Sequence, residues 1–289
     1  MANVIETFKN YVPMLDEVYK AAALTSYLDG AAELAREGAN ANELIIPMME
    51  MDGLADYDRN GGYTAGSVNL TSQTVACNFD RGRKFNVDNL DDAETAGIAF
   101  GRLAAEFIRT KVVPEIDAFR IAKYAGKENV KTVAADLTTG ANVVAAVRAG
   151  TNELDEQEVP VEGRVLLITP TLKGMIDDLD TTKSKAILGR FEKVIEVPQS
   201  RMYTAIQQKS GKDGEVVGGY AKASGAKNIN FLILHKDALI QYQKHVAPRV
   251  FDPSVNQEAD AWQFTYRNVG IADVYKNKVA GVYVHTATA

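Results

Sequence analysis

The side chains that most often perform chemistry in proteins are few in this chain and poorly placed for it. The three histidines, His235, His245 and His285, form no HxxxH or HxH pair, and metal sites usually need such local pairing beside carboxylate or thiolate partners. The single cysteine, Cys77, has no base near it in the sequence, so a structural thiol is favoured over a nucleophile. These residues predict no metal centre and no cysteine enzyme.

The motifs of nucleotide-binding and acyl-transfer sites are also missing. The glycines of "GEVVGGY" lack the spacing of a phosphate-binding loop, and no serine stands in a GxSxG sequence. Neighbouring carboxylates such as Asp177 and Asp178 are typical of solvated helix ends. We therefore expect no enzyme, hence no catalytic residue, no cofactor and no metal ligand. The alternative from another class is a cytosolic α/β enzyme that uses Asp177, Asp178 or His235.

A basic cluster formed by Arg81, Arg83 and Lys84 stands among four aspartates between residues 80 and 92. Salt bridges within the chain are one interpretation, and contacts with acidic groups of a neighbouring subunit are the other. Nucleic-acid binding is the least favoured, because three cations among carboxylates make a weak electrostatic footprint. We retain the three residues as candidate contacts between subunits.

Composition narrows the class of protein further. The 289 residues are 46% hydrophobic, 24% charged and carry a net charge of −6, which argues against a surface built to grip nucleic acid through its phosphates. A single cysteine permits no intramolecular disulfide, so a reducing compartment is expected. The N-terminal MANVIETFKN has no basic-then-apolar signal segment, and no apolar run approaches the ~20 residues that span a bilayer. We expect a soluble protein without a membrane partner, cytosolic where it is made.

One long helix is predicted from Asp91 to Gly126. Asp91 and Glu94 have the pattern of a capping box, and Gly126 is a helix-ending residue. Pro114 removes a backbone donor and predicts a kink near residues 108–114. The helix would span roughly 50 Å at ~1.5 Å per residue, about the diameter of a compact sphere of this many residues, so it suits a strut in a flat or elongated subunit. Two apolar runs at helical spacing support it: Ala96, Phe100, Leu103 and Phe107, then Ile108, Val112, Ile116 and Phe119.

Residues 38–90 have the composition of a long hairpin. "NELIIPMMEM" and "SVNLTSQTVACNF" read as strands, and the glycine-rich stretch between them reads as a flexible tip. "DRGRKFNVDNLD" is expected to carry the chain into the helix. A two-stranded hairpin is marginal alone in water, so it must pack on its own subunit or on a neighbour. Tyr57, Arg59 and Tyr63 are the candidate contact residues of the tip, since aromatic residues and Arg are enriched in interfaces.

The remaining segments alternate between helix and strand. Residues 5–30 and 31–38 read as short helical pieces. Beyond residue 130 we expect helices at 140–157 and 171–180, strands at 163–170 and 193–204, a mobile loop at 213–227, a strand running into a helix at 229–245, and two or three strands at 261–285.

The order of these parts resembles that of the major capsid proteins of tailed bacteriophages, the Hong Kong 97-like fold. The resemblance covers nearly the whole chain and lies above all in the junction "DRGRKFNVDNLDDAETAG" and the helix that it opens. It implies an α+β fold with five segments: an N-terminal arm (1–37), an extended loop (38–90), the spine helix of a peripheral domain (91–131), an axial domain (132–240), and remaining strands shared by the two domains (241–289).

The resemblance also implies a function. Copies of the chain would assemble, as hexamers and pentamers, into an icosahedral shell that encloses double-stranded DNA without sequence-specific binding. A portal and a separate scaffolding protein are implied partners, since the chain begins close to the arm. The location would be the virion capsid, assembled in the cytoplasm of a host bacterium. An encapsulin-type nanocompartment shell, which resembles the same fold, is the closest alternative.

Overall fold

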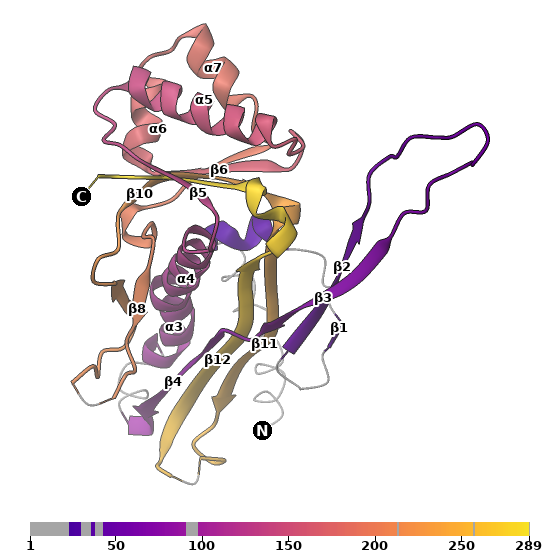
Figure 1. Ribbon diagram of the computed structural model, residues 1–289. Helices are drawn as coiled ribbons and strands as arrows, with labels where there is room; N and C mark the ends of the chain where they lie inside the picture. The colour runs from indigo at the N-terminus through magenta and orange to yellow at the C-terminus, as the bar shows by residue number, and fades with distance from the viewer. Residues whose placement is uncertain are drawn as a thin grey trace.

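The computed structural model describes residues 23–29, 36–37, 43–90, 98–212, 214–256 and 258–288. Figure 1 shows a five-stranded sheet with helices above it, a long helix and a second sheet below it, and a hairpin that projects to one side. The mixture of helix and sheet agrees with the expected α+β class.

The five-stranded sheet has the order β5-β13-β10-β6-β7 and is buried on both faces. β6 and β7 are parallel, as are β13 and β5, while β10 is antiparallel to both of its neighbours. Because side chains alternate along a strand, Leu166 and Ile168 of β6 face an upper core, and Val165 and Leu167 face a lower core. The strands are β5 (Lys131–Ala134), β6 (Arg164–Ile168), β7 (Lys193–Glu196), β10 (Ile229–His235) and β13 (Val282–Thr286).

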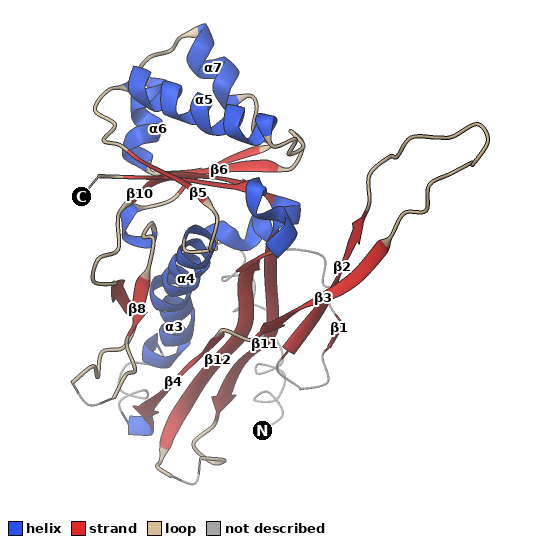
Figure 2. Cartoon of the chain, in the orientation of Figure 1, coloured by secondary structure: helices blue, strands red, loops and turns tan. Residues whose placement is uncertain are grey.

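The helices within residues 140–188 cover the upper face of this sheet (Figures 1 and 2). α5 (Gly140–Glu156) buries Val143 and Val147 against it, and Thr139 caps that helix by accepting a hydrogen bond from the backbone N–H of Asn142. α6 (Pro170–Asp177) and α7 (Thr182–Leu188) complete the layer. The helix expected at 140–157 and the strand expected before Pro170 are confirmed.

The long helix lies below the sheet and consists of α3 (Ile98–Phe107), a π-helical turn (Ile108–Val112) and α4 (Val113–Ala125). The sequence predicted a kink near residues 108–114, and the structure has this π-helical turn there. In it the Val113 N–H donates to the Ile108 carbonyl, five residues back, and the Thr110 hydroxyl donates to the Glu106 carbonyl at 2.7 Å. Pro114 cannot donate a backbone hydrogen bond, and the wider turn accommodates its ring.

The predicted end of the long helix is confirmed at Gly126, whose N–H donates to the Ala122 carbonyl. A Cβ at position 126 would lie 3.0 Å from that carbonyl oxygen, so close packing explains the glycine there. The predicted capping residues Asp91 and Glu94 lie outside the described residues.

A second sheet, β11-β12-β4, packs beside the long helix and corrects two expectations. β4 (Phe79–Asp88) is a strand paired with β12 (Ala261–Val274), where we expected only a connection into the helix. β11 (Leu239–Phe251) is also paired with β12, where the sequence predicted a helix. In both cases pairing with a long neighbouring strand overrides local propensity.

The hairpin consists of β2 (Glu43–Met51) and β3 (Val68–Ala76), paired antiparallel along their whole length. Both predicted strands are confirmed. A short strand, β1 (Arg36–Glu37), pairs with β2, where a helical piece was predicted for 31–38. The hairpin therefore ends at Ala76, and the residues after it belong to the second sheet, although the sequence interpretation extended the loop segment to residue 90.

Residues 23–29 form a short 3₁₀ turn (Leu24–Leu28) held by a buried carboxylate of α4. Asp117 accepts hydrogen bonds from the N–H groups of Leu24 and Thr25 at 3.2 Å each and from the Thr25 hydroxyl at 2.6 Å. Arg201 donates to the same carboxylate at 3.0 Å. This part of the predicted arm is thus fixed to the long helix, while residues 1–22 and 30–35 lie outside the described ranges.

Candidate functional site

The hairpin carries an apolar face that has no cover within the described chain. Met49 pairs with Leu70, and Met51 pairs with Val68, so the four side chains lie on one face of the two strands. They are 57%, 69%, 67% and 64% exposed, respectively. We call these four residues the apolar hairpin face. Contiguous exposed apolar surface is typical of interaction sites.

The apolar hairpin face was not predicted from the sequence. β2 has large apolar residues at both odd and even positions, and which of them share a face with those of β3 depends on the register between the two strands. That register could not be read from either strand alone, because a one-residue slip moves every side chain to the other face.

The tip of the hairpin, residues 52–67, has an internal structure of its own. Asp52 accepts hydrogen bonds from the Ser67 N–H at 2.7 Å and the Ser67 hydroxyl at 2.8 Å, which closes the base of the tip. Asp58 and Gly62 exchange backbone hydrogen bonds farther out, with Gly62 at a φ of +81°. These bonds give the tip a defined shape, and Figure 1 shows it projecting away from the two larger sheets.

The three tip residues selected from the sequence are all exposed. The rings of Tyr57 and Tyr63 meet edge to face with centroids 4.9 Å apart, and Arg59 lies between them in sequence. Leu54 is also fully exposed and was not selected. The structure places these side chains where a neighbour could reach them, and their role as contacts stays a prediction.

The basic cluster at the start of β4 finds partners inside the chain. Arg81 donates to Glu115 at 2.8 Å and Arg83 to the Val216 carbonyl at 2.9 Å, while Lys84 forms an ion pair with Glu258 at 2.5 Å. The intrachain interpretation of these three cations therefore describes the single subunit. Their contact with a neighbouring subunit stays a prediction.

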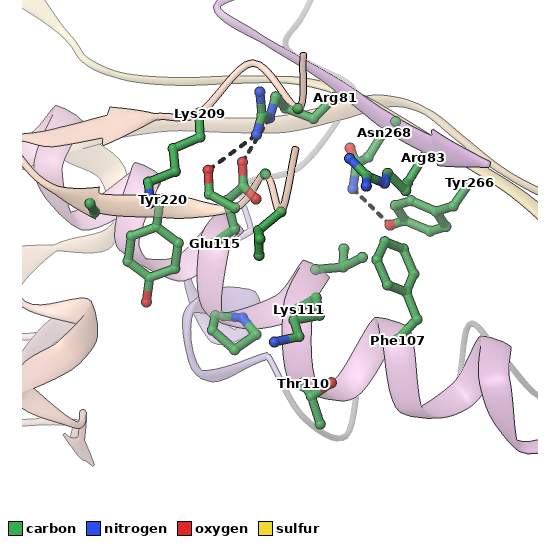
Figure 3. A pocket seen from close by; sticks show the side chains of 18 of the residues that line it. Arg81, Arg83, Phe107, Thr110, Lys111, Glu115, Lys209, Tyr220, Tyr266 and Asn268 are labelled. Carbon is green, nitrogen blue, oxygen red and sulfur yellow. Dashed lines mark hydrogen bonds and ion pairs between the residues drawn. The ribbon is translucent and has the colours of Figure 1, made fainter. Parts of the chain in front are cut away.

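A groove of about 920 Å³ lies between β4, the long helix and the loop of residues 209–219 (Figure 3). Its apolar wall includes Phe85, Phe107 and Tyr266. Phe107 contacts Phe85 edge to face at 4.8 Å and Tyr266 at 6.2 Å. The sequence predicted Phe107 on the buried stripe of the helix, and the structure shows it only half-buried, because the stripe opens onto the groove at this point.

The charged rim of the groove is mostly basic. Five basic side chains line it against two acidic ones, in a chain whose net charge is −6. The basic residues are Arg81, Arg83, Lys111, Lys209 and Lys222, and the acidic ones are Glu106 and Glu115. The basic residues come from β4, the π-helical turn and the β8 to β9 region. These segments are far apart in the sequence, so the sequence contained no signal that these side chains lie together.

The loop of residues 209–219 forms one wall of the groove and is held by the arginines of β4. Arg81 donates to the Gly219 carbonyl at 3.3 Å, and Arg83 donates to Val216. Gly211 has a φ of +75°, a backbone conformation that glycine adopts without strain and other residues rarely adopt. The adjoining strands are β8 (Ile206–Gln208) and β9 (Tyr220–Lys222). Within the range predicted as a loop, residues 220–222 are therefore a strand.

The residues named for a possible enzyme have structural surroundings. His235 is buried at the end of β10, and its Nδ1 accepts a hydrogen bond from the Asp237 N–H at 3.3 Å. Asp177 forms an ion pair with Lys173, one helical turn away, at 2.6 Å. Cys77 is half-buried between β3 and β4. Burial lowers the pKa of His285, whose ring stacks on Phe231.

Two searches of the described ranges concern other kinds of site. No group of three or more His, Cys, Asp or Glu side chains is arranged there to hold a metal ion. None of the helices in this part of the chain is both long enough and apolar enough to cross a membrane.

Comparison with known proteins shows the fold and little sequence similarity. No family model matches the chain, and no curated protein matches its sequence. A structure from Gordonia phage Cozz superposes with a TM-score of 0.61 at 12% identity, covering 92% of this chain and 87% of the other. The virus-like particle from Pyrococcus furiosus gives 0.60 at 13%, covering 97% and 99%. The capsid of Staphylococcus phage Andhra gives 0.57 at 12%, covering 89% and 83%. The similarity extends over nearly the whole length of each chain.

Proposed function

We propose that this chain, which has the Hong Kong 97-like fold of tailed-phage capsid proteins, is itself a major capsid protein whose copies assemble into an icosahedral shell around packaged double-stranded DNA. The observation that carries the proposal is the combination of that fold over about nine-tenths of the chain with a projecting hairpin whose apolar face is uncovered in the single subunit. A protein that worked as a monomer would have no use for such a face. In a shell, a neighbouring copy covers it.

The hairpin supports the assembly role in a second way. It extends away from both hydrophobic cores, and its tip is closed by its own hydrogen bonds. An apolar strand face that stays exposed beyond the base of the hairpin is costly to keep in solution, because such faces promote aggregation. A contact with another subunit compensates for that cost.

The direct test is the size of the native protein. We expect the full chain, expressed in bacteria and purified, to sediment as particles of many subunits, and electron microscopy to show closed shells of uniform diameter. A monomer or a small oligomer over a wide range of protein and salt concentrations would contradict the proposal and would favour the cytosolic α/β enzyme.

A second candidate is a nanocompartment shell of the encapsulin type. The virus-like particle from Pyrococcus furiosus, whose chain has an extent closely similar to this one, shares the fold. Images of the particles distinguish the two candidates: a shell with a portal at one vertex and a tail supports the phage capsid, and a shell that encloses protein cargo supports the nanocompartment.

The partners in the proposal are other copies of this chain, as hexamers and pentamers, together with a separate scaffolding protein, a portal and the enclosed DNA. The net charge of −6 supports a container that does not adsorb its DNA tightly. In the proposal the shell is assembled in the host cytoplasm and becomes the virion capsid. No residue is assigned to catalysis. A hydrolase or transferase activity abolished by alanine at His235, Asp177 or Cys77 would overturn that assignment.

A further inference from the structure

We propose that Asn60 and Gly61, in the outer turn of the hairpin tip, form a spontaneous modification site. At this site the Asn60 side chain is converted to a carboxylate through a cyclic imide, and the carboxylate of Asp58 is the base that assists ring closure. The reaction needs no enzyme and no reactant other than water. The inference goes beyond the proposed function, because it concerns the covalent chemistry of the single chain.

The chemistry follows from the two residue types and their order. The backbone nitrogen of Gly61 attacks Cγ of Asn60, so that a C–N bond forms, the Cγ–Nδ2 bond breaks and a succinimide ring closes. The Gly61 nitrogen loses its proton to the base, and the departing amino group takes up a proton and leaves as ammonia. Water then opens the ring at either carbonyl, which gives aspartate or isoaspartate without oxidation or reduction. Glycine lacks a Cβ, so it obstructs this attack least.

The sequence and the fold both single out this position. Asn60 is the only asparagine in the chain that precedes a glycine, and Asn-Gly is a strong turn signal. The turn is present, because the Gly62 N–H donates to the Asp58 carbonyl at 2.7 Å and the Asp58 N–H donates to the Gly62 carbonyl at 3.2 Å. Asn60 and Gly61 lie between these bonds, and both are exposed to water.

The groups that must react are free to do so. Among the residues that the structure describes, no hydrogen bond involves the N–H of Gly61 or the side-chain amide of Asn60. An attacking nitrogen held in a helix or a sheet would first have to give up its backbone hydrogen bond. Here ring closure costs no such bond.

Asp58 holds a carboxylate beside the same peptide. Its Oδ1 accepts a hydrogen bond from the Asn60 N–H at 2.9 Å. Its Oδ2 is 3.0 Å from the position that a Cβ on Gly61 would take. The carboxylate therefore lies against both residues that react, at the edge of the peptide whose nitrogen must lose a proton. A side chain placed in this way can act as a general base.

The tip also contains a second candidate, Asp52 before Gly53, which the structure disfavours. An aspartate forms the same ring only when its carboxyl is protonated. The Asp52 carboxylate accepts hydrogen bonds from the N–H and the hydroxyl of Ser67, and these bonds hold its pKa below its usual value. Ring closure there would break both bonds, so modification is expected at residue 60 and not at residue 52.

The product changes the charge and the backbone of the tip. The new carboxylate joins those of Asp52, Asp56 and Asp58, and Arg59 is the only basic residue of the tip. An isoaspartate also adds one backbone carbon inside the turn that Asp58 and Gly62 close, so the turn must change shape. The share of modified copies therefore records the age of the protein.

The test follows the tip peptide of the purified full chain by mass spectrometry during incubation in mildly alkaline, heavy-oxygen water. We expect a form that has lost ammonia, and then a form that carries one heavy oxygen and is partly isoaspartate, at residue 60 before any other asparagine. Asp58→Asn retains an oxygen that can accept from the Asn60 N–H, and it should slow the loss of ammonia severalfold. The matched control, Asp56→Asn, removes an equal charge from the tip and should leave the rate unchanged.

A further variant, Gly61→Ala, adds a methyl group beside the attacking nitrogen and should slow the reaction about tenfold, which corresponds to about 1.4 kcal/mol of activation free energy. The site is overturned if Asn60 stays intact for weeks or changes no faster than Asn86 of β4. A rate for Asp58→Asn that equals or exceeds the rate for Asp56→Asn overturns Asp58 as the base. The measurement needs no particles, so its failure leaves the proposed shell untouched, and failure of the shell leaves this inference untouched.

Discussion

At the scale of single residues, Arg81 joins three parts of the subunit. Its guanidinium donates hydrogen bonds to the carboxylate of Glu115 on α4 and to the carbonyl of Gly219 in the loop of residues 209–219. The Glu115 side chain is only 12% exposed, so it depends on this partner for compensation of its charge. Sequence reasoning found the cation and could not find the carboxylate, which lies 34 residues away on another element.

Arg81→Ala is expected to lower the free energy of unfolding by about 2 kcal/mol, because it leaves a mostly buried carboxylate without its charged donor. Urea unfolding of the unassembled subunit measures this. The matched control is Arg109→Ala, which removes an exposed pair with Glu106 on one helix and should cost no more than about 0.5 kcal/mol. Equal losses for the two variants would show that the Arg81 contact contributes little.

Asp155 makes the stability of the subunit sensitive to acid. Burial by itself raises the pKa of this carboxyl, but hydrogen bonds from the fully buried Arg164 and from Arg190 outweigh burial and leave the pKa below its ordinary value. A carboxyl with a lowered pKa in the folded state stabilises the fold above its unfolded pKa of about 3.9, and this contribution is lost as the pH falls through the folded value.

Asp155→Asn should therefore flatten the dependence of unfolding free energy on pH below about pH 5. The measurement is urea unfolding at a series of pH values, with Asp178→Asn, at an exposed position, as the control that keeps the slope of the unaltered chain. A slope unchanged by Asp155→Asn would mean that other carboxylates carry the acid sensitivity.

At the scale of elements, the long helix is buried unevenly. Phe119 of α4 is 5% exposed in the lower core and meets Phe79 at 5.0 Å, while Phe107 is half-buried beside the groove. The sequence pattern placed them in two successive apolar runs and predicted that Phe107 is buried, because helical periodicity identifies a face and does not say what covers it at each turn.

Phe119→Ala is expected to cost about 3–5 kcal/mol and to send much of the protein into the insoluble fraction. Phe107→Ala should cost roughly half as much, because part of its ring is already in contact with solvent. Urea unfolding of the two variants measures both losses of unfolding free energy. An equal or larger loss for Phe107→Ala would show that the aromatic cluster around Phe107 excludes solvent in the free subunit.

The hairpin tip gives a different kind of prediction, one that separates folding from assembly. Replacing residues 54–65 by a short Gly-Ser linker retains the closing bonds between Asp52 and Ser67 and removes side chains that lie outside both cores. Thermal unfolding of the unassembled subunit should be nearly unchanged, while sedimentation should show failed or aberrant particles. If both folding and assembly survive, the tip is no contact between subunits; if folding collapses, it belongs to the core.

The elements that the sequence could predict are those with strong local signals. Clear periodicity identifies the hairpin strands, α5 and the long helix. Gly126 marks the end of the long helix, and Pro170 follows the end of β6. β4 was missed because its exposed positions are charged and its alternation was read as a connecting segment. The groove could not be predicted at all, since it is formed by residues near 81, 107 and 217 that only the tertiary fold brings together.

At the scale of the whole molecule, the two cores share one sheet. The upper core contains Val147 and the lower core contains Phe119, and alternate residues of β6, β7, β10 and β13 contribute to both. The only tryptophan, Trp262, packs against the lower core from β12. Loss of either core exposes a face of the shared sheet, so neither half has a complete core without the other.

The subunit should therefore unfold in one transition. Val147→Ala, which removes about 2 kcal/mol of buried contact from the upper core, should shift the fluorescence transition of Trp262 in the lower half to lower denaturant, together with the far-ultraviolet circular dichroism. A fluorescence midpoint that stays in place while the circular dichroism divides into two steps would show that the halves unfold independently.

The length of the hairpin has a consequence for the lattice of copies. Each strand has nine residues, which at ~3.3 Å per residue gives an arm of roughly 30 Å before the tip begins. In the proposed shell the hairpin reaches the next copy, so the length of this arm sets the spacing between neighbouring subunits. Two residues added to each strand would lengthen the arm by roughly 7 Å and keep Met49 and Leu70 on the same face of the hairpin. One residue added to each strand would move these side chains to the opposite face. The dimensions of the shell would then follow from a segment that packs on its own subunit only near its base, where Val75 clusters with Ile240 and Ile271.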